Sequence, residues 1–192
     1  MSNDEPGEYY TEERWQNWLN RLRDEELDAE QEESARLLRN LQYDTAIAVA
    51  KILTDHQNDT IDEERALTEL TDIQEITLEE VEFDDEDAVI LLDGVQTSLL
   101  CVLYAGKEFV AAGPAEGTIG QYIEAATVAE DEGDIDDALG YCVQAGTMLI
   151  DGQHLDLEMA GELDFGPVAQ WVNGLESLQN AMSDPEFVEE EG

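Results

Sequence analysis

The most conspicuous shortage in this chain is positive charge. Its 192 residues include 8 lysines and arginines against 49 aspartates and glutamates, which gives a formal net charge of -41 at pH 7. Lysine is the scarcer cation, because Lys51 and Lys107 are its only examples. Binding DNA or RNA across the general surface requires clustered lysine and arginine to neutralise phosphates. The composition therefore argues against direct nucleic-acid binding.

Cysteine and long apolar runs are scarce as well. Cys101 and Cys142 lie in apolar helical context without a neighbouring cysteine or histidine, which is typical of buried thiols rather than of a disulfide. The longest apolar stretch, residues 88–105, is interrupted by Asp93 and Gln96 and falls short of a membrane span. The opening residues lack the basic and apolar regions of a secretory signal. We therefore expect a cytoplasmic protein without a membrane partner.

The excess of acid has two explanations. Hydrophobic residues make up 42% of the chain and recur at helical spacing, so a core can form with the carboxylates outside it. Such a surface repels itself in dilute buffer, but about 1 M salt shortens the screening length to roughly 3 Å. The alternative is a carboxylate surface that mimics nucleic acid or captures cations. Because the acids are spread over every segment and only residues 79–87 are dense, we predict adaptation to high salt.

Apolar spacing predicts an all-α fold of about seven helices. In chain order, we expect one helix that begins near Thr11 and three helices at about 30–57, 60–74 and 87–112. Two further helices flank a turn at 132–134, and the last helix covers 166–181. Short connections favour antiparallel neighbours, so we expect an irregular bundle or a short stack of helix pairs. This single helical domain would occupy residues 9–183, between disordered tails at 1–8 and 184–192.

Two helix starts and one strand are further expectations. Thr60 with Glu63, and Thr77 with Glu80, have the spacing of capping boxes, in which each side chain satisfies a backbone N–H of the first turn. Alternating apolar residues also allow a short strand near residues 76–83, although no partner strand is visible.

Arginine and tryptophan gather in the first predicted helix. Five of the six arginines lie within residues 14–39, and Arg14 and Arg21 flank an apolar stripe that contains Trp15 and Trp18. Exposed tryptophan and arginine together are typical of protein interfaces, so these four residues are our candidates for partner binding. In the alternative interpretation the tryptophans belong to the core and the arginines pair with nearby glutamates.

The predicted hairpin, residues 118–150, resembles a single tetratricopeptide unit. Its small and packing residues stand at Ala126, Gly133, Ala138, Cys142 and Ala145. Small residues let two helices approach closely, and glycine permits the tight turn between them. The resemblance implies a peptide-binding groove. However, about three stacked units are needed for stability, no second copy is present, and the larger aromatic positions are missing, so an ordinary helical hairpin is the alternative.

Catalytic and metal-binding patterns are missing. There is no glycine-rich phosphate loop, no G-x-S-x-G elbow and no Cys-x-x-Cys pair, and 49 carboxylates single out no acid–base pair. His154 lies among acids, but zinc and di-iron sites need several converging ligands. Residues 55–59 resemble the start of a calcium loop, but Thr60 replaces the required glycine. We therefore predict no cofactor, no metal site and no catalytic residues.

The chain as a whole resembles an uncharacterised haloarchaeal family of acidic helical proteins, defined as a domain of unknown function. The resemblance rests on the opening YYTEERWQNWLNRLRDEELD and on the hairpin sequence GDIDDALGYCVQAG. It implies an archaeal, cytoplasmic origin and carries no activity, ligand or site.

Our working hypothesis is a non-enzymatic helical interaction or adaptor protein that binds a protein partner through its first helices or its hairpin. The alternatives are a metal-binding or carboxylate-based enzyme in a helical bundle, and a regulator within a nucleic-acid-associated complex. No feature of the sequence sets the oligomeric state.

Overall fold

The structure, a computed structural model, describes residues 9–28 and 30–183, which form eight helices and no strand. The helices are α1 (Glu12–Asp24), α2 (Glu32–Gln57), α3 (Glu63–Thr77), α4 (Glu86–Ala112), α5 (Ile119–Asp131), α6 (Ile135–Ile150), α7 (Leu157–Gly161) and α8 (Pro167–Ser183). The predicted all-α bundle is therefore confirmed. The predicted tails at 1–8 and 184–192 lie outside the described residues.

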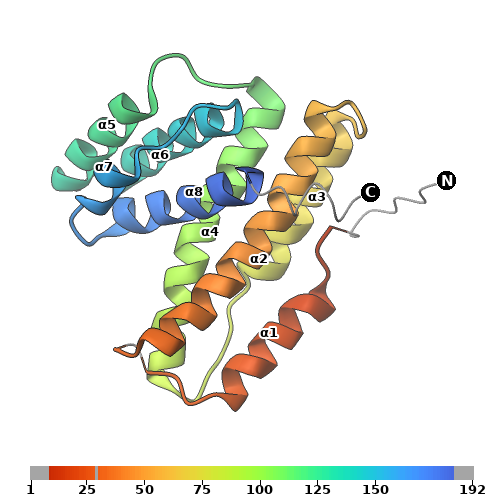
Figure 1. Ribbon diagram of the computed structural model, residues 1–192, viewed down its shortest axis with the longest axis vertical. Coiled ribbons are helices and arrows are strands. Elements are labelled where there is room, and N and C mark those ends of the chain that lie inside the picture. The colour runs from red at the N-terminus through yellow and green to blue at the C-terminus, as the bar shows by residue number, and fades with distance from the viewer. Residues whose placement is uncertain (1–8, 29, 184–192) are drawn as a thin grey trace.

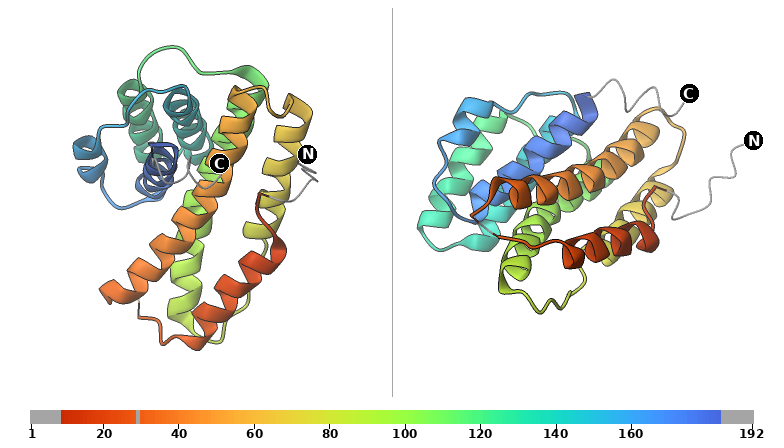
Figure 2. Two further views of the ribbon diagram at one scale, coloured as in Figure 1. Left: turned by 45° about the vertical axis from the view of Figure 1, so that its right-hand side comes forward. Right: turned by 60° about the horizontal axis from the view of Figure 1, so that its bottom comes forward.

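The long helix α4 is the centre of the arrangement. It contacts α2 and α3 from the first half of the chain and α6 and α8 from the second half. In Figure 1, α2 and α4 run along the long axis, α8 crosses them, and the α5–α6 hairpin lies beside the upper part of α4. Figure 2 shows α1 packed against the lower part of the molecule, next to α3.

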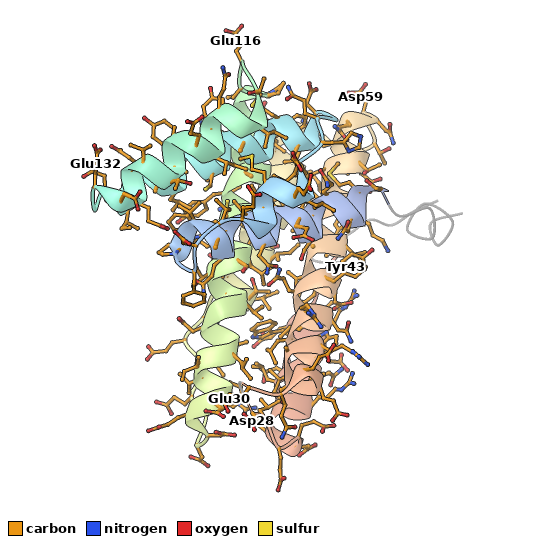
Figure 3. The ribbon with its side chains drawn as sticks, turned by 60° about the vertical axis from the view of Figure 1, so that its left-hand side comes forward. Asp28, Glu30, Tyr43, Asp59, Glu116 and Glu132 are labelled. Carbon is orange, nitrogen blue, oxygen red and sulfur yellow. The ribbon has the colours of Figure 1, made fainter. Side chains whose placement is uncertain are left out.

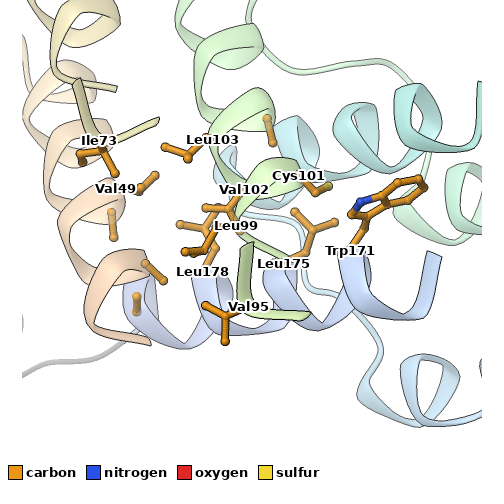
Figure 4. Packing of buried hydrophobic residues seen from close by; sticks show 14 of the residues in the cluster. Val49, Ile73, Val95, Leu99, Cys101, Val102, Leu103, Trp171, Leu175 and Leu178 are labelled. Atoms are coloured by element: carbon orange, nitrogen blue, oxygen red, sulfur yellow. The ribbon is translucent and has the colours of Figure 1, made fainter. Parts of the chain in front are cut away.

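The core is built on the apolar surface of α4. Leu99, Val102 and Leu103 are fully buried, and Figure 4 shows them between α2 and α3 on one side and Leu175 and Leu178 of α8 on the other. By length and composition alone α4 could cross a membrane. Half of its apolar window is buried, and α4 contacts four neighbouring helices.

Two glycines allow the second half of the chain to approach α4 closely. A β-carbon at Gly146 of α6 would lie 2.5 Å from the β-carbon of Ala105, and one at Gly174 of α8 would overlap the main-chain carbonyl of Ser98. The amide of Gln42 also links α2 to α8, because its Nε2 donates to the Ser177 hydroxyl at 2.8 Å and to the Asn173 side chain at 3.0 Å. These contacts fix the hairpin and α8 relative to the long helices.

The predicted capping box at Thr60 is wrong. Asp62 caps α3 instead, and its carboxylate accepts a hydrogen bond from the Arg65 backbone N–H at 2.8 Å. Thr60 lies in the turn after α2, where its N–H donates to the Asp55 carbonyl at 2.8 Å and Asp59 adopts a left-handed φ of 60°. The left-handed conformation suits aspartate and turns the chain before α3 can begin.

The predicted capping box at Thr77 and the short strand at 76–83 are also wrong. Thr77 is the last residue of α3, and its hydroxyl donates to the Ile73 carbonyl within the same helix. The segment that follows is irregular up to α4. Its backbone is held by Gln96 of α4, whose Nε2 donates to the carbonyls of Thr77 and Glu79 at 3.0 and 2.9 Å. A side chain therefore satisfies the groups that a partner strand would have satisfied.

The hairpin forms where the sequence predicts it, and one short helix was not predicted. Gly133 has a φ of +85°, and the N–H of Asp134 returns to the Ala129 carbonyl at 2.8 Å, which is the closure typical of a helix C-terminus before a glycine. The short helix α7 begins after Asp156, which caps it through its carboxylate. Because α7 has only five residues and no fully buried side chain, it has no apolar stripe to reveal it.

Candidate interaction surfaces

The first predicted partner-binding residue, Trp15, lies in the core. Thr11 caps α1, which places Trp15, Leu19 and Leu22 on one buried face. The side chain of Trp15 has no exposed surface, and its Nε1 has no hydrogen-bond partner among the described residues. Trp15 therefore contributes packing and offers no surface to a partner in this arrangement.

Two of the other three predicted residues, Arg14 and Trp18, converge on Asp44 of α2. The carboxylate of Asp44 accepts hydrogen bonds from Arg14 Nε at 2.8 Å and from Trp18 Nε1 at 3.0 Å, and a second oxygen pairs with Arg14 Nη2. The guanidinium of Arg21 lies 5.4 Å from the Trp18 ring centre, and that of Arg14 lies 5.3 Å from the Tyr10 ring centre. Arg14 and Trp18 thus attach α1 to α2, and Arg21 remains exposed beside them.

A second surface is the outer side of the hairpin. Val128 of α5 and Tyr141 of α6 are 52% and 39% exposed, although both are large and apolar. Between them Ala125 and Ala129, one helical turn apart, leave a hollow because alanine has the shortest side chain with a β-carbon. The resulting groove has a volume of about 500 Å³. We call it the hairpin groove. Its lining comprises Gln121, Glu124, Ala125, Val128, Ala129, Glu132, Asp134, Asp137 and Tyr141.

The hairpin groove has an apolar base and a rim of four carboxylates and the amide of Gln121. Glu124, Glu132, Asp134 and Asp137 surround it, and Figure 3 shows Glu132 at the far tip of the hairpin. Lysine and arginine are absent from the whole of residues 108–192. The groove therefore combines exposed apolar surface with negative charge that no lysine or arginine of residues 108–192 offsets.

A third surface differs from the hairpin groove in its charge. It is a hollow of about 540 Å³ between α3, α4 and α6, lined by Leu67, Tyr104, Lys107, Leu139 and neighbouring residues. The Lys107 ammonium donates to the Gln74 side chain at 2.6 Å, and burial lowers its pKa, an effect that Glu75 only partly offsets. Asp136 and Glu108 also line this hollow, so charges of both signs are present and no complementary partner charge is indicated.

The buried cysteines have the chemistry of packing groups. Burial raises the pKa of the Cys101 thiol well above its ordinary value and that of Cys142 to about 12, with Glu130 adding to the second effect. Both therefore carry their proton at neutral pH, whereas a nucleophile or metal ligand needs the thiolate. Across the described residues, no group of three or more histidine, cysteine, aspartate or glutamate side chains is arranged to hold a metal ion.

Val128 and Tyr141, which line the hairpin groove, were not among the residues predicted from the sequence. Two signals could have found them. The first is that Val128 falls outside the apolar stripe of Ile119, Ile123 and Ala126. The second is that no lysine or arginine follows Lys107 in the chain. The first signal indicates an apolar side chain on the solvent side of a helix. The second signal indicates that this helix lies in the part of the chain without positive charge.

Comparison with known proteins connects the chain to one family. A family model described as an uncharacterized protein conserved in archaea, DUF2150, matches residues 8–191. No curated protein and no solved structure matches the chain.

Proposed function

The chain belongs to this archaeal family, and from that premise we propose that it is a non-enzymatic interaction or adaptor protein whose binding surface is the hairpin groove. The main observation in its favour is that the side chain of Val128 is 52% exposed, in a groove of about 500 Å³ that Ala125 and Ala129 also line. Exposed apolar surface rimmed by polar groups is typical of protein contact sites. The tetratricopeptide-like spacing of the hairpin supports the same assignment.

We further propose that the protein works in the cytoplasm of a salt-loving archaeon. In the part of the chain that the structure describes, Glu69 is the only buried carboxylate, at 1% exposure, and it pairs with Arg65 at 3.3 Å. The remaining described acids reach solvent to some extent, where they repel one another in dilute buffer. Salt of molar concentration reduces this repulsion, so the composition is consistent with a haloarchaeal cytoplasm.

Affinity capture with two matched variants tests the binding surface. Val128→Glu places a charge in the groove, and Val89→Glu makes the same change at a 43% exposed valine in the first turn of α4. In extract of the source cells at about 2 M KCl, we expect wild type and Val89→Glu to retain a stoichiometric partner and Val128→Glu to lose about 90% of it. Equal recovery by both variants would exclude the hairpin groove as the binding surface.

The same capture distinguishes the groove from the first helix. Trp18→Ala together with Arg21→Ala removes the half-buried tryptophan and the exposed arginine of the predicted α1 surface, while Arg14 and Asp44 keep their ion pair. If the groove is the binding surface, this variant retains the partner as long as far-UV circular dichroism shows it folded. Loss of the partner by a folded Trp18→Ala/Arg21→Ala protein would transfer the site to α1.

A further inference from the structure

We propose that the occupant of the hairpin groove is an amphipathic helix that carries arginine, an inference that rests on the proposed function. The groove extends from Gln121 to Glu132 along α5, a rise of about 16 Å at 1.5 Å per residue. A partner helix of about three turns matches that length. Binding of one apolar helix face in a groove is a common mode of peptide recognition.

The shape of the base selects apolar side chains from the partner. Ala125 and Ala129 lie one turn apart on α5, with Val128 on one side and the Tyr141 ring on the other. The Tyr141 ring is itself supported by Tyr122, whose ring centre is 6.5 Å away, and the Tyr122 hydroxyl is fixed by the Glu116 carbonyl at 3.0 Å. A leucine-sized side chain at every third or fourth position of the partner would fill this hollow.

The rim selects positive charge. Four carboxylates line the groove, and the nearest lysine or arginine in sequence, Lys107, lines the separate hollow between α3, α4 and α6 and donates to Gln74. An acidic partner would place like charges opposite one another, which costs free energy even at moderate salt. The complementary partner therefore has cations on both sides of its apolar face.

High salt decides which cation is suited to this rim. At about 2 M salt, attraction over more than a few ångströms is screened, so only cations in direct contact with carboxylates contribute. Arginine makes such contacts in pairs, because its planar guanidinium matches the two oxygens of a carboxylate. The chain itself docks α1 on α2 in this way, with Arg14 on both oxygens of Asp44 and the Trp18 ring beside it.

Binding of synthetic peptides to the full-length protein tests this inference. The probe is a labelled, end-capped peptide of about 15 residues with leucine on one helical face, arginine on both flanks and alanine elsewhere. Two counterparts replace every arginine by lysine or by glutamine. By fluorescence anisotropy at about 2 M KCl, we expect the arginine peptide to bind about threefold tighter than the lysine peptide and about tenfold tighter than the glutamine peptide.

Matched variants separate the groove from the general acidity of the surface. Val128→Glu should weaken binding of the arginine peptide about tenfold and Val89→Glu less than about twofold. Glu124→Gln with Asp137→Asn should weaken it about fivefold, whereas the distant exposed pair Glu33→Gln and Glu64→Gln, with the same change in net charge, should not. Equal binding by the two valine variants, or by the arginine and glutamine peptides, would overturn the inference.

Two further outcomes are distinguishable. If Val128→Glu releases the cellular partner but does not affect the arginine peptide, the groove remains the binding surface and the assigned partner chemistry is wrong. If sedimentation shows a dimer that Val128→Glu dissociates and Val89→Glu does not, the occupant is a second copy of this chain, which also overturns the arginine-helix assignment.

Discussion

Gly174 of α8 lies directly on the main-chain carbonyl of Ser98 in α4, so closely that a β-carbon at position 174 would overlap it. The contact has no flexible side chain that could move aside, because the obstructing atoms belong to the α4 backbone. Gly174 therefore sets the distance between α4 and α8.

Alanine at position 174 should destabilise the protein. Gly174→Ala forces α8 away from α4, and we expect a loss of about 3 kcal/mol in the free energy of unfolding. Gly140→Ala is the matched control, since Gly140 lies in α6 with nothing within 4 Å of an added β-carbon. Helix propensity should make that variant about 0.5–1 kcal/mol more stable. Thermal unfolding at high salt measures both changes, and the same sign for the two variants would contradict this assignment.

The carboxylate of Asp44 should be needed for docking α1. Asp44→Asn removes the charge that Arg14 and Trp18 share, and its side chain is only 19% exposed. We expect a loss of about 1–2 kcal/mol in unfolding free energy, because a charged hydrogen-bond acceptor is replaced in a partly buried site. Asp93→Asn, on the exposed side of α4, should leave stability unchanged. In a double-mutant cycle of Asp44→Asn with Arg14→Gln, most of the stability lost in Asp44→Asn should be measured as coupling energy between the two residues.

Alkaline pH should unfold the protein partly through Tyr10. Burial raises the pKa of Tyr10 from 10.0 to about 12, so the neutral phenol is favoured in the folded state. The resulting stability is fully present below pH 10 and is lost as pH rises toward 12. Tyr10→Phe should therefore flatten the fall in thermal midpoint between pH 10 and 12, whereas Tyr104→Phe, at a 38% exposed ring, should not. An identical fall in all three proteins would show that Tyr10 does not contribute.

Salt should control folding. Repulsion among exposed carboxylates is screened as KCl rises, so helicity and the thermal midpoint should increase steeply between about 0.2 and 2 M KCl. Circular dichroism against temperature at fixed protein concentration measures both quantities. A protein that is equally helical and equally stable in dilute buffer would contradict the proposed adaptation to salt.

The sequence predicts the helices well because each long helix buries a continuous apolar stripe. The period that contains Leu99 and Val102 identifies α4, and Gly133 marks the hairpin turn. Local polar patterns are less informative. Thr60 and Thr77 both have capping spacing, yet Thr60 lies in the turn after α2 and Thr77 is the last residue of α3. Whether a residue ends one helix or starts the next depends on the neighbouring backbone.

Local sequence does not contain the long-range contacts that shape the α1 surface and the hairpin groove. The period of α1 places Trp15 and Trp18 on the same side, but only the position of Asp44, 26 residues after Trp18, makes one of them a hydrogen-bond donor. Likewise, no local pattern shows that Gly146 and Gly174 both meet α4, because both contacts join segments distant in sequence. The hairpin groove also needs Tyr141 of α6 beside α5, and only the packing of the two helices places it there.

Site-specific photo-crosslinking shows whether the hairpin groove contacts a partner. A benzophenone-bearing residue replaces Val128 in the groove or Val89 at the start of α4, both of which are exposed. After irradiation of source-cell extract at about 2 M KCl, we expect one discrete adduct from position 128 that is absent from position 89. The same adducts from both positions, or an adduct from position 89 alone, would contradict it.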